Sequence, residues 1–196
     1  GAVLLYNLHY KPDITPQILF EEHRKWGRIH ATMAMAGTNH DNSAEPDRKL
    51  RIGYISPNFN QHSVAYFFEP LLKTHNHDAF EIYGYNNSKE TDNVTERMRP
   101  QFEAFRDIYN LTDEKTAEII VRDKIDILVD LAGHTANSSL LVFARKSAPI
   151  QVAWLGYPGT TGMQQMDYRI TDEFAEPPDY HKYYTETQVF LPDGFL

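Results

Sequence analysis

Two histidines of this 196-residue sequence stand where a general base or a substrate-orienting group is expected. His62 lies between an apolar segment, 50–56, and an apolar helical pattern that begins at Ser63. Beside a helix N-terminus the positive end of the helix dipole favours the neutral imidazole, which is the form that accepts a proton. We therefore predict a catalytic role for His62, as a general base. The competing interpretation is that His62 only caps its helix.

His134 follows Gly133 directly after the apolar run 125–131. Gly133 permits close approach of the backbone to a ligand, and Thr135 offers a hydroxyl and a backbone N–H near the start of the next helix. We expect Gly133, His134 and Thr135 to bind substrate. The alternative is a tight turn from strand to helix, closed by a bond from His134 Nδ1 to the backbone.

The segment 156–162 contains three glycines, a proline and two threonines. Pro158 fixes one backbone dihedral angle and the glycines free others, so the segment is expected to be a loop. Thr160 and Thr161 are expected to donate hydrogen bonds to sugar or phosphate oxygens. The competing interpretation is an ordinary turn, because many turns have this composition.

Carboxylates flank the same apolar segments. Asp126 is expected to be solvated at a strand edge, and Asp130 to accept hydrogen bonds beneath the site. Asp167 and Asp172 are expected to cap loops. The other histidines are expected at solvated positions without metal-ligand spacing, so no metal site is predicted; they are His9, His23, His30, His40, His75, His77 and His181.

These residues follow segments that alternate between strand and helix patterns. The run 125–131 is apolar on both faces, as a central strand of a parallel sheet is, and ligands bind at the carboxyl ends of such strands. The segment 149–155 is the next strand, and if the two strands are neighbours their loops form one wall. We predict an α/β fold, a Rossmann-like parallel sheet with helices on both faces. The expected strands are 50–56, 80–85, 105–110, 125–131, 149–155, 166–171 and 187–191, and the expected helices are 14–35, 63–74, 92–105, 112–121 and 138–146.

The organisation along the chain is predicted in three parts. Residues 1–36 are a helical segment, with Ile18, Leu19, Trp26, Ile29 and Met33 at roughly helical spacing. Residues 37–49 are polar and rich in turn-forming residues, which is typical of a linker. Residues 50–196 form the Rossmann-like domain.

Composition excludes several classes of function. The 27 acidic residues outnumber the 19 basic ones and give a formal net charge of -8, and no basic cluster is present, so nucleic acid is not an expected partner. Cysteine is absent, and no apolar run is long enough to span a membrane. The expected location is the cytoplasm. No glycine-rich dinucleotide or P-loop motif occurs, so no cofactor is expected.

The ordered motifs resemble one family, the tetratricopeptide-linked protein O-GlcNAc transferases of the bacterial branch, which includes the SPINDLY-type enzymes. The resemblance rests on segment 50–57 with Phe59 and His62, and on segments 65–72, 126–135, 148–162 and 166–172. It implies one half of a GT-B glycosyltransferase, without the repeats or the C-terminal half. It implies that this half lines the acceptor and sugar side of the cleft with His62, with the loop Gly133, His134 and Thr135, and with substrate-binding residues Gly156, Tyr157, Pro158, Gly159 and Thr160. It also implies inverting, metal-independent transfer of N-acetylglucosamine or a related sugar from a UDP-type donor to Ser/Thr of a protein acceptor. Asn58 and Ser63 depart from the family pattern, which has aspartate and, in some members, proline there.

Two other functions fit the sequence. One is a non-catalytic domain that binds a sugar nucleotide or a protein. The other is an unrelated Rossmann-like enzyme such as a sugar-nucleotide epimerase, although the missing dinucleotide motif counts against it. If the family resemblance holds, this half alone is expected to be inactive, because the missing half would hold most of the nucleotide.

Overall fold

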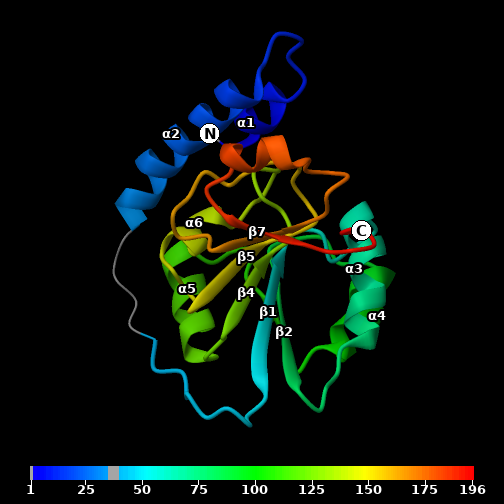
Figure 1. Ribbon diagram of the computed structural model, residues 1–196. Helices are drawn as coiled ribbons and strands as arrows, with labels where there is room; N and C mark the ends of the chain where they lie inside the picture. The colour runs from blue at the N-terminus through cyan, green and yellow to red at the C-terminus, as the bar shows by residue number, and fades with distance from the viewer. Residues whose placement is uncertain (1, 35–39) are drawn as a thin grey trace.

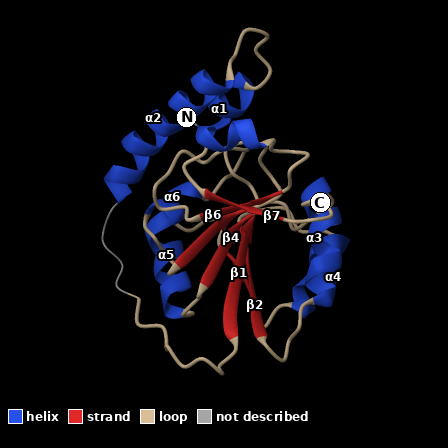
Figure 2. Cartoon of the chain, viewed as in Figure 1, coloured by secondary structure: helices blue, strands red, loops and turns tan. Residues whose placement is uncertain are grey.

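Seven parallel strands form the centre of the protein in a computed structural model that describes residues 2–34 and 40–196. Their order across the sheet is β3-β2-β1-β4-β5-β6-β7, and Figure 2 shows them as the middle layer between helices. β4 is the central strand, as its apolar character predicts. The strands are β1 Leu50–Ser56, β2 Phe80–Asn86, β3 Ala104–Asp107, β4 Ile127–Asp130, β5 Ile150–Ala153, β6 Tyr168–Thr171 and β7 Thr187–Phe190.

Helices cover both faces of the sheet, which confirms the predicted α/β class. α3 (Ser63–Thr74) and α4 (Asn93–Met98) lie on one face, and α5 (Asp113–Arg122) and α6 (Leu140–Ala144) lie on the other (Figure 1). Successive strand residues point to opposite faces, so Leu128 belongs to the core beneath α5 and α6 while Val129 belongs to the core beneath α3. The sheet therefore has an apolar core on each side.

The predicted helix over 92–105 is too long. The structure has α4, a 3₁₀ turn at Arg99–Gln101 and then the edge strand β3. Pro100 cannot donate the backbone hydrogen bond that a continuing α-helix needs, and residues 104–107 instead pair with β2. Pairing with the sheet edge thus replaces the last part of the expected helix.

The N-terminal segment forms two helices, α1 (Ala2–Leu8) and α2 (Pro16–Ala34), which lie across the carboxyl edge of the sheet (Figure 1). Pro16 occupies the first helical position, and Thr15 accepts a hydrogen bond from the Ile18 N–H at 3.3 Å. The apolar residues that recur at helical spacing do not all lie on the buried face of α2, because Ile18 and Ile29 are exposed. The buried face instead carries His23, Gly27 and Ala31. The side chain of Met33 and residues 1 and 35–39 lie outside what the structure describes.

Residues 40–49, the described part of the expected linker, are fastened to the amino edge of the sheet. Asp126 accepts hydrogen bonds from Arg48 at 2.6 and 2.7 Å, from the Arg51 N–H at 2.8 Å and from Asn42 at 2.6 Å. The prediction that Asp126 is solvated is therefore wrong, since it is 7% exposed. A buried carboxylate requires such partners, and the linker provides two of them.

Candidate functional site

The topology places a cavity where the strand order changes direction. The chain proceeds from β1 to β2 on one side of the sheet, and β4 then lies on the other side of β1. A crevice outside the carboxyl ends of the strands at such a point is the usual ligand site in open α/β sheets. A cavity of about 970 Å³ lies there. Its walls are the loops after β1 (57–62), β2 (88–92) and β4 (Ala136 and Asn137), with Tyr109 after β3.

His62 is exposed and lines this cavity. Its Nδ1 accepts a hydrogen bond from the Val64 N–H at 3.1 Å, which makes His62 the N-cap of α3. The capping interpretation is thus confirmed, and it does not exclude a role in the cavity. In the neutral ring an accepting Nδ1 leaves the proton on Nε2. In this conformation the free end of the ring is a hydrogen-bond donor.

Asp92 fixes the loop that carries His62. Its carboxylate accepts from the Gln61 N–H at 2.7 Å, and also from the N–H groups of Val94 at 2.9 Å and Thr95 at 3.1 Å. The last two bonds belong to a capping box that begins α4. The sequence reasoning did not single out Asp92 as a site residue, although Asp followed three residues later by Thr at a helix start is a capping signal. One carboxylate therefore joins the β1 and β2 loops of the cavity.

The Gly133–Thr135 turn is held from beneath by Asp130. The Asp130 carboxylate accepts from the Ala132 N–H at 3.1 Å and the Gly133 N–H at 2.8 Å, as the sequence predicts. Burial raises the pKa of this carboxyl to about 6. Gly133 has φ of 58°, and a Cβ there would lie 2.2 Å from the Tyr157 Cβ. β4 and β5 are neighbours, so the two loops form one wall, as expected.

His134 does not line the cavity of His62. It is fully buried, and its Nε2 donates to the Thr161 carbonyl at 2.8 Å. Its ring packs against Trp26 and His23 of α2, with centroids 4.6 and 5.0 Å apart. Burial lowers the pKa of His134 to about 3, so the ring is neutral. The structure thus brings His134 to α2, and leaves substrate binding by its side chain an untested prediction.

The threonine hydroxyls of the 156–162 loop are occupied within the protein. The Thr160 hydroxyl donates to Glu186 at 2.6 Å, and the Thr161 hydroxyl and N–H donate to the same carboxylate. The expected donation to sugar or phosphate oxygens is therefore not seen in this conformation. Pro158 and Gly159 line a separate cavity of about 210 Å³ beside α2.

Arg169 holds the same loop from within the domain. It is 3% exposed, and it donates to the carbonyl oxygens of Tyr157 at 3.0 Å and Gly159 at 3.3 Å. Its charge is balanced by Glu176, which is also buried. Neither Arg169 nor Glu186 was predicted to matter. Arg169 lies 7 residues and Glu186 lies 24 residues after the end of the loop, and no local pattern connects either of them to it.

Leu155, at the start of this loop, has an uncommon backbone conformation. Its φ is 74°, and the Gly156 N–H donates to the Trp154 carbonyl at 2.9 Å across it, which is a γ-turn. A branched side chain rarely adopts positive φ, and such strain is concentrated at functional sites. A Cβ on Gly156 would lie 1.9 Å from the Leu131 carbonyl oxygen. Leu155 is therefore an additional candidate that the sequence analysis missed.

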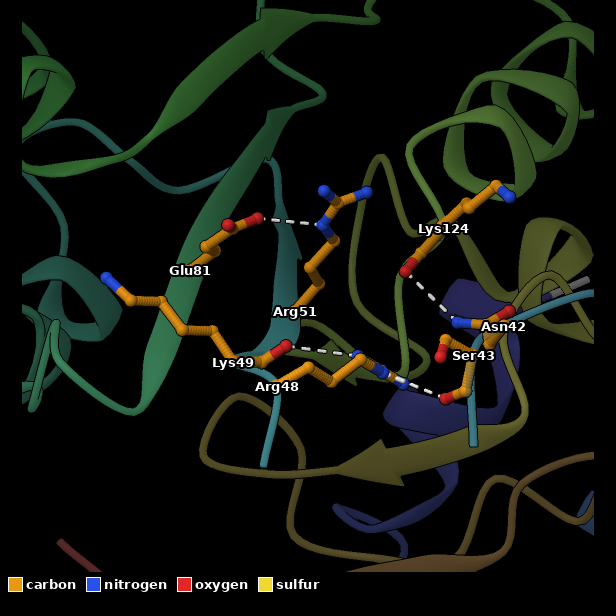
Figure 3. Close-up of a pocket in the computed structure, with 7 residues that line it drawn as sticks. All are labelled: Asn42, Ser43, Arg48, Lys49, Arg51, Glu81 and Lys124. Carbon is orange, nitrogen blue, oxygen red and sulfur yellow. Dashed lines mark hydrogen bonds and ion pairs between the residues drawn. The ribbon is translucent and has the colours of Figure 1, made fainter. Parts of the chain in front are cut away.

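A further cavity of about 260 Å³ lies at the opposite, amino edge of the sheet (Figure 3). Four of its seven lining residues are cationic, namely Arg48, Lys49, Arg51 and Lys124. Figure 3 shows Arg51 donating to Glu81, at 2.7 Å, and Arg48 donating to the Lys49 carbonyl. Arg51 also donates to the Asp123 carbonyl, and Arg48 to the Asp126 carboxylate. These donors fasten the linker and the sheet edge, so we assign this cavity a structural role.

Two findings concern ligands and membranes. Among residues 2–34 and 40–196, no group of three or more His, Cys, Asp or Glu is placed to hold a metal ion. None of the helices in the described part of the chain has both the length and the apolar character of a membrane span.

A family model described as glycosyl transferase family 41 matches residues 27–196. Two similar curated proteins are named probable UDP-N-acetylglucosamine–peptide N-acetylglucosaminyltransferase SPINDLY. The one from Arabidopsis thaliana is 44% identical and the one from Solanum lycopersicum is 41% identical, each over 200 residues. These matches cover 100% of this chain and 22% of each relative. The chain thus spans about a fifth of these relatives.

The fold of this chain also matches that of a solved structure. It is a mutant of the Thermobaculum terrenum O-GlcNAc transferase, with a TM-score of 0.94 and 38% sequence identity. The match covers 100% of this chain and 38% of that chain.

Proposed function

This chain belongs to glycosyl transferase family 41, and from that premise we propose that the whole protein transfers N-acetylglucosamine from a UDP-linked donor to serine or threonine of proteins. The observation that carries the proposal is the cavity of about 970 Å³ with His62 at its wall. It lies where an open α/β sheet binds ligands. The names of the similar proteins supply the donor and the peptide acceptor.

We propose that this chain is one half of a GT-B enzyme and is inactive by itself. The chain matches 38% of the solved O-GlcNAc transferase chain, which is consistent with a second half that closes the cavity. In such an arrangement the other half holds most of the nucleotide, and this half faces the acceptor and the sugar. Inversion in a single displacement and independence from metal follow from the family resemblance.

The bond from Val64 to His62 supports a specific role for this histidine. With Nδ1 occupied by the Val64 N–H, the Nε2–H is free to orient an oxygen of the acceptor or the sugar. To act as a general base, His62 has to release the helix cap and present a bare nitrogen. We propose the donor role for the conformation described, and the base role requires a turn of the ring.

We propose that the predicted loop residues act mainly as a scaffold. The backbone of Gly133, Thr135 and Gly156 remains a candidate for substrate contact at the carboxyl edge. His134, Tyr157, Pro158, Gly159 and Thr160 support that backbone from the side of α2. The shape of this backbone, rather than the threonine hydroxyls, then carries recognition by this wall, because the N–H groups of Gly133, Thr135 and Gly156 already donate to Asp130, Ala132 and Trp154.

The test compares His62→Ala with His62→Asn in the full-length protein. Transfer of labelled N-acetylglucosamine to an acceptor peptide is the measurement. We expect both variants to lose at least about 100-fold in turnover, the usual scale for a positioned proton donor or acceptor. Asparagine is a good N-cap, whereas alanine at this position costs about 1 kcal/mol of helix stability. Equal losses of turnover in the two variants would therefore come from the missing imidazole and not from a weakened helix.

Three outcomes would contradict parts of the proposal. Unchanged turnover in His62→Ala would remove the assigned role of His62. A wild-type protein that binds UDP-N-acetylglucosamine but never transfers the sugar would instead be the non-catalytic binding domain. Addition of a chelator to the active protein is expected to leave the rate unchanged, and inhibition that added divalent metal reverses would refute metal independence.

A further inference from the structure

We propose that His23, on α2 outside the Rossmann-like domain, is a positioning residue for the cavity wall and acts through the hydroxyl of Tyr157. This inference rests on the proposed transferase function. It gives the helical segment, defined as α1 and α2, a role in the active site, although no residue of α1 or α2 lines the cavity of His62.

The hydrogen bonds around Tyr157 have only one consistent direction. His23 Nδ1 lies 2.6 Å from the Leu19 carbonyl, which can only accept, so His23 Nδ1 carries the proton. In the neutral ring His23 Nε2 then accepts, and the Tyr157 hydroxyl, 2.6 Å away, donates to it. His9 Nε2, 3.0 Å from the same oxygen, completes the chain as a donor. Burial lowers the pKa of His23 to about 4, which keeps this ring neutral.

The side chain of Tyr157 packs directly against Gly133, in the turn after β4. The space that a Cβ on Gly133 would occupy is filled by the Tyr157 Cβ, Cγ and ring at 2.2 to 3.2 Å. The Gly133 N–H also donates a hydrogen bond to Asp130, and this bond holds Gly133 against the Tyr157 ring. The residues three and four positions further on, Ala136 and Asn137, line the cavity with His62. A displacement of Tyr157 therefore reaches the cavity wall directly.

The packing of α2 against the 156–162 loop leaves little room for His23 and Tyr157 to move apart. A Cβ on Gly27 would lie 2.0 Å from the Gly162 carbonyl oxygen, and a Cβ on Gly162 would lie 2.2 Å from the His23 carbonyl oxygen. Helix and loop thus touch backbone to backbone at the turn of helix that carries His23. The ring of Trp26 closes over His134 beside them. Such tight packing transmits small shifts rather than absorbing them.

The first arm of the test uses His23→Leu and His23→Gln in the full-length protein. Leucine fits the buried site but cannot accept the Tyr157 proton, so we expect kcat to fall about 10- to 100-fold, the scale of a misplacement near 1 Å. Glutamine can accept that proton and is expected to restore most of kcat. His23→Leu leaves the buried Tyr157 hydroxyl without its acceptor, which costs about 1–3 kcal/mol, so kcat is compared at a temperature well below the melting temperature of this variant.

The control is Lys25→Ala, an exposed change on the same helix, which should leave kcat unaltered. The second arm combines His23→Leu with Tyr157→Phe. If His23 acts through Tyr157, the double variant is no slower than the slower single variant. Fully additive losses, or wild-type kcat in His23→Leu, would overturn the inference.

Hydrogen exchange separates this inference from the proposed function. His23→Leu is expected to speed amide exchange over residues 131–137, whereas Lys25→Ala is not. If the wild-type protein transfers no sugar, the proposed function fails, but faster exchange at this turn would still support the coupling from α2. Exchange that matches the wild type would refute the coupling even in an active enzyme.

Discussion

Replacing Gly27 by alanine tests how α2 packs against the domain. Helix propensity predicts a gain in the free energy of unfolding, whereas tertiary packing predicts a loss. In an exposed helix this change stabilises by about 1 kcal/mol, since glycine is a poor helix former. In this structure the new Cβ would lie 2.0 Å from the Gly162 carbonyl oxygen and 2.8 Å from its carbon. These are backbone atoms, which cannot rotate away as the end of a side chain can.

The magnitude follows from that contact. The helix or the loop has to retreat by about 1.5 Å to reach an ordinary van der Waals distance. Overpacking of a well-packed site costs up to about 3 kcal/mol. After the gain in helix propensity of about 1 kcal/mol, we expect a net loss of about 2 kcal/mol in the free energy of unfolding. For a domain of this size that lowers the melting temperature by about 4–8 °C.

The assay is thermal unfolding followed by calorimetry, together with amide exchange along α2. Lys25→Ala is the matched control, because it adds alanine to the same helix and removes only an exposed ion pair of 3.8 Å; it should change stability by less than about 0.5 kcal/mol. A melting temperature of Gly27→Ala at or above that of the wild type would refute the reasoning. It would mean that α2 does not rest on the 156–162 loop.

Two further predictions concern charge. Arg169→Met leaves Glu176 buried without its partner and should cost about 3–5 kcal/mol; Arg169→Met combined with Glu176→Leu should cost less, and urea midpoints that rank the two the other way would contradict this. The lowered pKa values of His23, about 4, and His134, about 3, predict stability that is complete above pH 6.5 and falls as the pH drops toward 4 and 3, because the unfolded chain takes up protons that the buried rings do not. The His23 share is about 3 kcal/mol, and Asp130, with its pKa raised to about 6, offsets part of the loss below that pH. Acid unfolding followed by tryptophan fluorescence is expected to show a shallower pH dependence in His23→Leu, and a curve parallel to the wild type would count against it.

The sequence alone was sufficient for most of the elements and for their order, with the helix over 92–105 as the exception. Period and turn chemistry are local, so β1, α3, β2 and α5 begin and end within a few residues of their predicted limits. The central place of β4 followed from its apolar character on both faces, and the neighbouring β4 and β5 loops form one wall as predicted. Asp130 was also found correctly, since an aspartate at a strand end before a glycine turn has few other partners.

The tertiary structure decided which face each side chain uses. The helical pattern of α2 permitted either Ile18 and Ile29 or His23 and Gly27 as the buried face. The close backbone contact of Gly27 with Gly162 selects the second, and that contact joins residues far apart in the chain. A histidine was therefore buried where sequence reasoning expected a solvated one.

Tertiary packing also explains why only some of the predicted site residues face the cavity. His62 lines one cavity with Ala136 and Asn137, which follow the turn after β4, whereas the predicted residues Gly133, His134 and Thr135 are not among the residues that line it. The hydroxyls of Thr160 and Thr161 instead face Glu186, and His134 faces α2. Sequence patterns identify which residues stand at the carboxyl edge, because strand direction fixes that. Whether a side chain there meets ligand or protein depends on what packs above it, and only the assembled chain determines this.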